Sequence, residues 1–336
     1  MSRRVIPGLE APDAALEADI RARLDQVEQA LEKSVRVESS GLLSETSSYL
    51  IAAGGKRFRA MLVLLAGYFG DPTDPRLIGG SVSIELVHLA TLYHDDVIDE
   101  ADSRRGAPSA NMRWDNTVAI LSGDFLFARA SEISTELGTD VCRLLARTIA
   151  ILCDGQIREV DSSAKVEQPE SNYLEIIRRK TASLIGTSCR LGGMLSDATP
   201  EHTDILEEFG DALGMAFQLS DIMDITATQL ELGKEPGSDL RLGVYTAPVL
   251  HALAHDEHRE ELARILGHGA PDGELLDRAL EIVRGGGSID HARRAVTGEV
   301  GRAIGLARSL PAGPAQHALE QLARFLAARC GAEQTP

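Results

Sequence analysis

A run of carboxylates at the end of an apolar stretch constrains this sequence more than any other feature. Residues 93–106 read YHDDVIDEADSRRG, and residues 84–92 before them are mostly apolar. This pattern predicts a buried helix whose end reaches a polar surface. Asp95 and Asp99 would share one face of that helix, with Asp96 offset behind them. Like charges at this spacing disfavour a helix by about 0.2–0.5 kcal/mol unless a cation lies between them.

The residue types around these acids favour a metal and a phosphate group. Hard divalent cations prefer oxygen ligands, and Mg²⁺ commonly takes one or two carboxylates together with substrate phosphates. Arg104 and Arg105 follow these acids in the same segment, and one guanidinium group can bind two phosphate oxygens at once. The segment therefore predicts a diphosphate pocket with Mg²⁺, although a solvated acidic helix end is the alternative that the spacing alone leaves open.

Composition limits the class of protein. The chain has 336 residues, 43% of them hydrophobic and only 4% aromatic, and it shows no convincing alternation typical of strands. The net charge of −17 argues against a nucleic-acid partner, which would require a basic face. An anionic substrate would instead need metal ions or a local basic cluster.

The apolar periodicity predicts an all-α fold, a single large helical bundle; the family resemblance described below implies that this bundle surrounds a central cavity. We expect a flexible lead-in over residues 1–12 and one all-helical domain over 13–336. No signal peptide is evident, and the longest apolar run, residues 60–69, is too short to span a bilayer. The four cysteines are scattered, with no CxxC and no zinc-like spacing, so a reduced, cytoplasmic protein is expected. The predicted helices cover residues 14–33, 43–53, 56–68, 74–100, 114–137, 140–161, 171–195 and 200–230, followed by a loop over 233–243 and four shorter helices.

A second acidic element occurs late in the chain, in the sequence FQLSDIMD of residues 217–224. Asp221 and Asp224 are three residues apart and would again share a helix face. Two acidic helix ends that face each other in one bundle can hold several Mg²⁺ ions around one diphosphate. The alternative is that Asp224 faces solvent.

Taken together, the motifs resemble those of the trans-type polyprenyl diphosphate synthases, of the long-chain bacterial type. They occur in the order of that family and extend over about 190 residues of the sequence. Each is weak alone, and their combination is specific. The matching segments are GGKRFR (54–59), HLATLYHDDVIDEADSRRG (88–106), GDFLFARA (123–130), GQI (155–157), KTASL (180–184), AFQLSDIMD (216–224) and GKEPGSDL (233–240).

The resemblance implies a role for each matching position. The enzymes of this family join isopentenyl diphosphate to an allylic diphosphate, using several Mg²⁺ ions per site. The acids and one lysine would form the catalytic centre: Asp95, Asp96, Asp99, Lys180, Asp221 and Asp224, with Asp95, Asp99 and Asp221 as metal ligands. Isopentenyl diphosphate would bind to Lys56, Arg59, His88 and Arg105. The allylic diphosphate would be held by Arg104, Lys180, Thr181, Gln218 and Lys234.

The resemblance also places the determinants of product length before the first aspartate, at Ala90 and Thr91. Both side chains are small, which implies an open cavity floor and a long all-trans polyprenyl diphosphate. The alternative is that both are packing residues and that Ile84 or Val87 closes the cavity.

One departure from the family pattern concerns the second acidic motif. The family normally has FQxxDDxxD, whereas FQLSDIMD is one residue shorter. Because a deletion of one residue turns a helix by about 100°, both halves of the motif keep their register only with a local bulge or unwinding. Val244 also replaces a second loop lysine of some relatives.

Three functions remain open from the sequence. The leading one is an Mg²⁺-dependent prenyltransferase that performs a head-to-tail 1′-4 condensation. The second is a weakly active or non-catalytic partner subunit of a prenyl synthase, and the third is a class I terpene cyclase. The resemblance further implies a homodimer without a transmembrane segment, with peripheral membrane contact as a route for product release.

Overall fold

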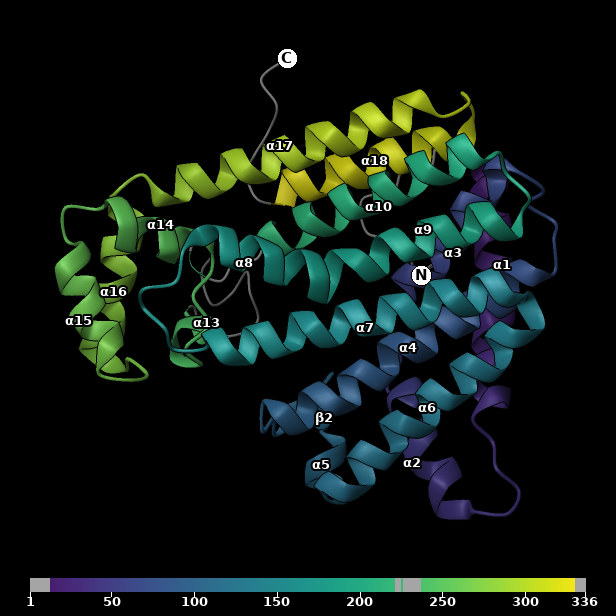
Figure 1. Cartoon of the computed structure of the whole chain (residues 1–336), viewed down its shortest axis with the longest axis horizontal. Coiled ribbons are helices and arrows are strands. Elements are labelled where there is room, and N and C mark those ends of the chain that lie inside the picture. The colour runs from purple at the N-terminus through teal and green to yellow at the C-terminus, as the bar shows by residue number, and fades with distance from the viewer. Residues whose placement is uncertain (1–12, 221–224, 226–236, 330–336) are drawn as a thin grey trace. The chain divides into compact units, whose positions relative to one another are not determined.

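The computed structural model describes residues 13–220, 225 and 237–329. Its regular structure in these ranges is helical apart from one short hairpin (Figure 1), so the all-α prediction is confirmed. The chain divides into two compact units. The first comprises residues 1–149, 184–207 and 309–319, and the second comprises 150–183, 208–308 and 320–336. The single domain over 13–336 stays a prediction.

The first half of the chain supplies most of the first unit. Its elements are α1 (Ala14–Ser34), α2 (Gly41–Ala52), α3 (Phe58–Ala66), the 3₁₀ turn η1 (Gly67–Phe69), α4 (Arg76–Ile98), strands β1 (Ser103–Arg104) and β2 (Ala107–Pro108), α5 (Ala110–Arg113) and α6 (Asn116–Leu137). The later elements are α7 (Thr139–Ser162), α8 (Glu170–Ile177), the π-helical turn η2 (Arg178–Ala182), α9 (Ser183–Leu195), α10 (Pro200–Leu219), α13 (Ser238–Arg241), α14 (Ala247–His255), α15 (Arg259–Gly267), α16 (Gly273–Gly285), α17 (Ser288–Ser309) and α18 (Pro314–Arg329).

Side-chain caps set the starts of several helices. Asp13 accepts hydrogen bonds from the backbone N–H groups of Ala15 and Leu16 at the start of α1, at 2.8 and 3.2 Å. Ser40 and Asp115 cap α2 and α6 in the same way. Each cap satisfies a donor that the first turn of a helix leaves without an intrahelical partner.

Helices α3 and α4 form the core of the first unit. Every residue of α3 from Ala60 to Ala66 is buried, and α4 runs beside α6 (Figure 1). Helix α9 approaches α3 very closely, because a Cβ added at Gly192 would lie 2.2 Å from the carbonyl oxygen of Val63. Only glycine fits at this crossing.

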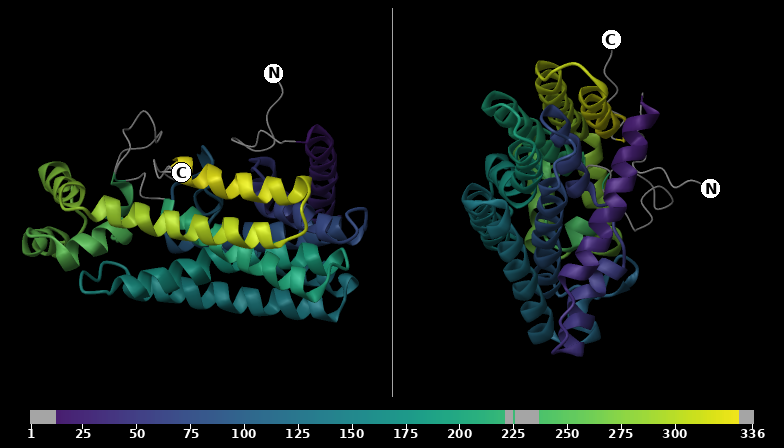
Figure 2. Two further views of the ribbon diagram at one scale, coloured as in Figure 1. Left: turned by 90° about the horizontal axis from the view of Figure 1, so that it is seen from above. Right: turned by 90° about the vertical axis from the view of Figure 1, so that its right-hand side faces the viewer.

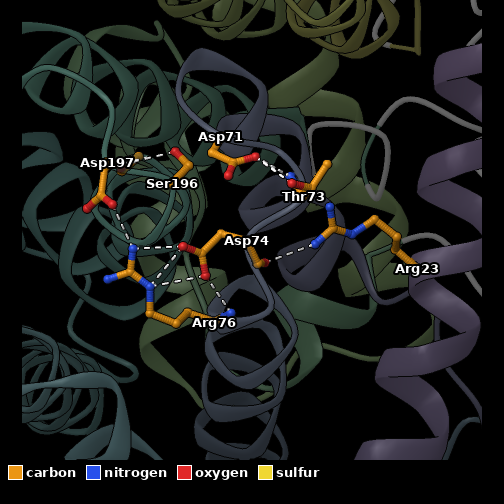
Figure 3. A network of polar contacts seen from close by, with 8 residues as sticks. Arg23, Asp71, Thr73, Asp74, Arg76, Ser196 and Asp197 are labelled. Atoms are coloured by element: carbon orange, nitrogen blue, oxygen red, sulfur yellow. Dashed lines mark hydrogen bonds and ion pairs between the residues drawn. The ribbon is translucent and has the colours of Figure 1, made fainter.

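A polar network holds the start of α4 against its neighbours in the first unit (Figure 3). Arg76 forms ion pairs with Asp74 at 2.8 Å and with Asp197 at 2.9 Å. Arg23 of α1 donates to the carbonyl oxygen of Asp74 at 3.4 Å. The backbone N–H of Asp71 donates to the carbonyl oxygen of Ser196 at 2.7 Å. The network therefore joins α1, the turn before α4 and the turn after α9.

In the second unit, helices α14, α15 and α16 pack against one another (green in Figures 1 and 2). The chain between α8 and α9 forms the five-residue turn η2. A π-helical turn accommodates one extra residue within a helix, and such turns occur frequently at functional sites.

The structure corrects several predicted boundaries. The helix predicted over 114–137 begins at Asn116, after the separate short helix α5. The helix predicted over 171–195 contains the π-helical turn η2, and the hairpin β1–β2 was not predicted. Within residues 247–329, where four helices were expected, there are five, α14 to α18.

None of the helices in the described ranges is long and apolar enough to cross a membrane.

Candidate active site

The first acidic motif occupies the C-terminal end of α4. Asp95 is half-buried, and Asp99, the residue that caps the helix, is exposed. The amide of Asp99 donates to the carbonyl oxygen of Asp95 at 2.8 Å, so the helical turn between them is intact. Asp96 differs from both, because its side chain is completely buried. The motif therefore divides into two carboxylates near the surface and one within the protein.

Arg104 is the partner of the buried carboxylate. Its Nε and Nη2 atoms lie 2.7 and 2.6 Å from Oδ1 of Asp96, whereas the buried Oδ2 of Asp96 has no hydrogen-bond partner among the described residues. Burial raises the pKa of Asp96 above its ordinary value, and the negative charge of Asp99 raises it further. The hydrogen bond from Arg104 opposes this rise. Asp96 thus orients Arg104 at the end of α4.

The hairpin β1–β2 separates Arg104 from Arg105. Arg104 pairs with Ala107, which leaves Arg105 and Gly106 as a two-residue turn with φ angles of 56° and 78°. Positive φ at both central positions is the pattern of a type I′ hairpin turn. Arg105 donates to the carbonyl oxygen of Leu50 at 3.0 Å and to that of Gly54. The turn therefore carries Arg105 away from Asp96 and toward the end of α2.

Arg105 lines a pocket of about 1150 Å³ within the first unit. The predicted residues Lys56, Arg59 and His88 line the same pocket, so the structure brings together all four residues to which isopentenyl diphosphate binding was assigned. The sequence reasoning missed further charged residues of its lining: Arg21, Asp25, Glu28, Arg57 and Glu85.

The electrostatics of this pocket favour an anion. Burial holds the pKa of His88 well below its usual value, and the charges of Arg59, Arg105, Arg57 and Arg104 lower it further. The pKa of Arg59 is also lowered by burial, Glu85 opposing and Arg105 adding to the shift. His88 is consequently neutral at neutral pH. A bound anion would stabilise the cationic side chains that crowd this pocket.

The two predicted length-determining residues differ in their surroundings. Ala90 is completely buried. Thr91 is half-buried, and its hydroxyl donates to the carbonyl oxygen of His88 at 2.8 Å. Thr91 lies one turn before Asp95, on the same face of α4. Of the two, Thr91 is therefore better placed to meet a chain that extends from the acids.

A second cluster lies in the second unit, around η2. Lys180 forms an ion pair with Glu159 of α7, and the hydroxyl of Thr181 donates to Oε1 of Gln218 at 3.0 Å. Gln218, Glu159 and Val244 line one small pocket of about 190 Å³. The structure thus brings Lys180, Thr181 and Gln218 together, and it adds Glu159, which the sequence reasoning missed.

Gly155, in the GQI motif, permits the approach of α7 to this turn. A Cβ at Gly155 would lie 2.6 Å from the backbone nitrogen of Lys180 and 2.9 Å from Cβ of Arg179. No other residue type has room here, so Gly155 sets the position of the backbone that carries Lys180 and Thr181.

The predicted residues Asp221, Asp224 and Lys234 lie outside the described residues. Their assigned roles, and the local bulge expected from the shortened motif, stay predictions.

Comparisons with known proteins identify the family. The model of the polyprenyl synthetase family matches residues 40–283. The chain belongs to this family. It is 39% identical to a nonaprenyl diphosphate synthase of Mycobacterium tuberculosis, over 97% of this chain and 98% of the relative. The prediction of a polyprenyl diphosphate synthase, a transferase of prenyl groups, is confirmed.

Solved structures agree with this assignment. A decaprenyl diphosphate synthase from Rhodobacter capsulatus superposes with a TM-score of 0.88 and 32% identity, over 94% of this chain and 98% of that one. A geranylgeranyl pyrophosphate synthase from Corynebacterium glutamicum, complexed with calcium and isoprenyl diphosphate, has a TM-score of 0.86 and 41% identity, over 96% and 99%. Polyprenyl synthetases of this fold thus include one with a divalent cation and an isoprenyl diphosphate.

The donor set at the end of α4 fits a divalent cation. Asp95 and Asp99 offer hard oxygen ligands one turn apart, which suits Mg²⁺ when substrate phosphates complete its coordination. Within the described ranges, there is no group of three or more His, Cys, Asp or Glu side chains that could hold a metal ion. A metal held by Asp95 and Asp99 would therefore need ligands from substrate, water or another part of the chain.

Two of the missed residues left a signal in the sequence. Glu85 is the one charged residue in the mostly apolar segment VSIELV of residues 82–87, and a charge at such a position needs a buried partner. Arg57 stands inside the motif GGKRFR, between Lys56 and Arg59. Its burial could not be read from the motif, because its partner Glu28 is 29 residues away.

Proposed function

We propose that the chain catalyses the Mg²⁺-dependent head-to-tail 1′-4 condensation of isopentenyl diphosphate with an allylic diphosphate, to give a long-chain all-trans polyprenyl diphosphate. The observation that carries the proposal is the arrangement within the first unit. Helix α4 contributes both to the lining of a basic pocket and to an acidic helix end. The two arginines of one hairpin divide between them: Arg105 lines the pocket, and Arg104 contacts Asp96 at the helix end.

In this proposal the basic pocket holds isopentenyl diphosphate. Lys56, Arg59 and Arg105 would meet the charge of its diphosphate with donors fixed before the substrate arrives. His88, whose pKa is held low by burial, would add a hydrogen bond without further charge. Isopentenyl diphosphate keeps its own diphosphate during the reaction, and in this proposal side chains alone hold that group.

Asp95 and Asp99 would hold the Mg²⁺ ions, which supply charge neutralisation for the leaving allylic diphosphate. Arg104, oriented by Asp96, would donate to the same diphosphate. The bond between C1 and oxygen of the allylic substrate breaks, and its electron pair leaves with the diphosphate. The double bond of isopentenyl diphosphate then joins its C4 to that C1, and the departing diphosphate accepts the proton lost from C2. The apolar residues of α4 below Asp95 would exclude water from the cation. The assignment of Lys180, Thr181, Gln218 and Lys234 to the allylic diphosphate stays a prediction of the resemblance.

A single assay tests the proposed function. Purified protein is incubated with farnesyl diphosphate, isopentenyl diphosphate and Mg²⁺, and the products are separated by chain length; EDTA serves as the metal-free control. Asp95→Ala should lower turnover by about 10²-fold or more, because it removes one of two ligands at the centre of charge neutralisation. The proposed metal site is wrong if Asp95→Ala elongates primers at the wild-type rate.

The homodimer and the cytoplasmic location also remain proposals. Exposed apolar side chains support the dimer: Met112 of α5 and Ile120 and Leu121 of α6 are 57%, 42% and 58% exposed. A second copy of the chain could cover them. The long-chain character of the product rests on the small Thr91 and on the long-chain relatives.

A further inference from the structure

Arg57 lines the basic pocket, yet its charge is already engaged. Its side chain is only 6% exposed, and Nε and Nη2 lie 2.6 and 2.8 Å from the two carboxylate oxygens of Glu28 on α1. Nη2 also donates to the carbonyl oxygen of Ile51 at 3.2 Å. This bidentate pairing fixes the plane of the guanidinium group.

Glu85 of α4 approaches Arg57 from the other side. It is 2% exposed, its Oε1 accepts from the amide of Ala60 at 3.0 Å, and its Oε2 lies 4.0 Å from Nη1 of Arg57. A Cβ at Gly55 would lie 3.1 Å both from that Nη1 and from Nη1 of Arg105. Arg57 is thus enclosed by α1, α4 and the loop that carries Lys56.

The backbone of Arg57 is also unusual. With φ 45° and ψ 42° it lies in the left-handed region, directly before the first residue of α3. Its carbonyl oxygen accepts the first hydrogen bond of that helix, from Met61 at 2.9 Å. A residue other than glycine keeps this conformation only where its surroundings enforce it. This backbone conformation sets the directions in which the side chains of the nearby Lys56 and Arg59 point.

We propose that Arg57 is a positioning residue for isopentenyl diphosphate. Held between Glu28 and Glu85, it fixes the left-handed turn that presents Lys56 and Arg59 to the diphosphate. This inference rests on the proposed function of the pocket. It assigns to Glu28, on a helix outside the recognised motifs, a part in substrate affinity.

Two substitutions separate the side chain from the backbone. Arg57→Gly removes the guanidinium group while glycine adopts the left-handed turn without strain, and Arg57→Lys keeps a charge but not the bidentate fork. For both we expect the KM for isopentenyl diphosphate to rise about tenfold or more, with kcat and the KM for the allylic primer nearly unchanged, as for a loss of uniform binding. Added guanidinium ion should partly restore the KM of Arg57→Gly. The matched control is Arg23→Lys, because Arg23 is also buried but does not line the pocket.

The outcomes are distinguishable. An unchanged KM for isopentenyl diphosphate in Arg57→Gly overturns the inference. So does a fall of kcat with a rise of both KM values and a lower Tm, since this would show a general structural role. Calorimetric titration of isopentenyl diphosphate into wild type and variants measures the affinity without turnover. If wild-type protein performs no condensation, the proposed function fails, while the titration still tests Arg57.

Discussion

Replacement of Gly155 by alanine should impair catalysis without unfolding the protein. The added Cβ would lie 2.6 Å from the backbone nitrogen of Lys180, whereas ordinary contact begins at 3.4 Å. The two backbones must therefore separate by about 0.8 Å, the difference between these distances, if the contact is to be relieved. The atoms that move belong to η2, which carries Lys180 and Thr181.

The magnitudes predict a small effect on stability and a large effect on the catalytic rate. Alanine in place of a helical glycine stabilises by about 1 kcal/mol, whereas overpacking destabilises by about 1–3 kcal/mol. The net loss of unfolding free energy should then be about 2 kcal/mol at most. A displacement of catalytic groups by about 1 Å can lower the rate about 10²-fold. We therefore expect a folded protein with a much lower kcat.

The assay compares kcat at saturating substrates with Tm for Gly155→Ala and for Gly301→Ala. Gly301 of α17 is the matched control, because a Cβ there meets nothing within 4 Å. This variant should be slightly more stable and fully active. If Gly155→Ala keeps the wild-type kcat, then either η2 moves without consequence or Lys180 and Thr181 do not act on the substrate, and the reasoning is refuted.

Three further predictions concern product length, assembly and pH. Thr91→Phe should shorten the products at little cost to the first condensation, with Thr91→Val as the control; an unchanged product distribution would place the growing chain on another face. Leu121→Glu should shift sedimentation at micromolar concentration from dimer to monomer, and a wild-type monomer would disprove the dimer. The pKa of His251 is lowered from 6.5 by burial and by His291 and His255, with Glu170 opposing and Arg294 adding to the shift. Since the unfolded chain then binds more protons, the free energy of unfolding should fall as pH drops below about 6.5, and less steeply in His251→Gln when followed by denaturant titration.

The first unit shows how much of a site can be predicted from sequence. The apolar run and the carboxylates after it correctly indicated the helix α4 and its polar end. Lys56 and His88 were placed in one pocket only through the resemblance to a family, because no periodicity relates residues 32 positions apart. The partners that hold Arg57 were missed for the same reason: Glu28 and Glu85 come from two other helices.

Other features escaped prediction because their signal is too short. Strands of two residues show no alternation that could be distinguished from a loop. The π-helical turn η2 differs from an α-helix by one residue, and a window over 171–195 averages this difference away. Gly155 of α7 packs closely against this turn, and the sequence of the turn itself gives no sign of that contact.

The hairpin β1–β2 limits how this part of the chain can vary in length. Arg104 contacts Asp96, whereas Arg105 contacts the end of α2. The two neighbouring arginines differ in this way because the two-residue turn of the hairpin begins at Arg105. Inserting or deleting one residue would shift the register and exchange the sides on which the two arginines lie. Substitutions elsewhere in the hairpin should therefore be tolerated more readily than any change in the number of residues between Asp99 and Gly106.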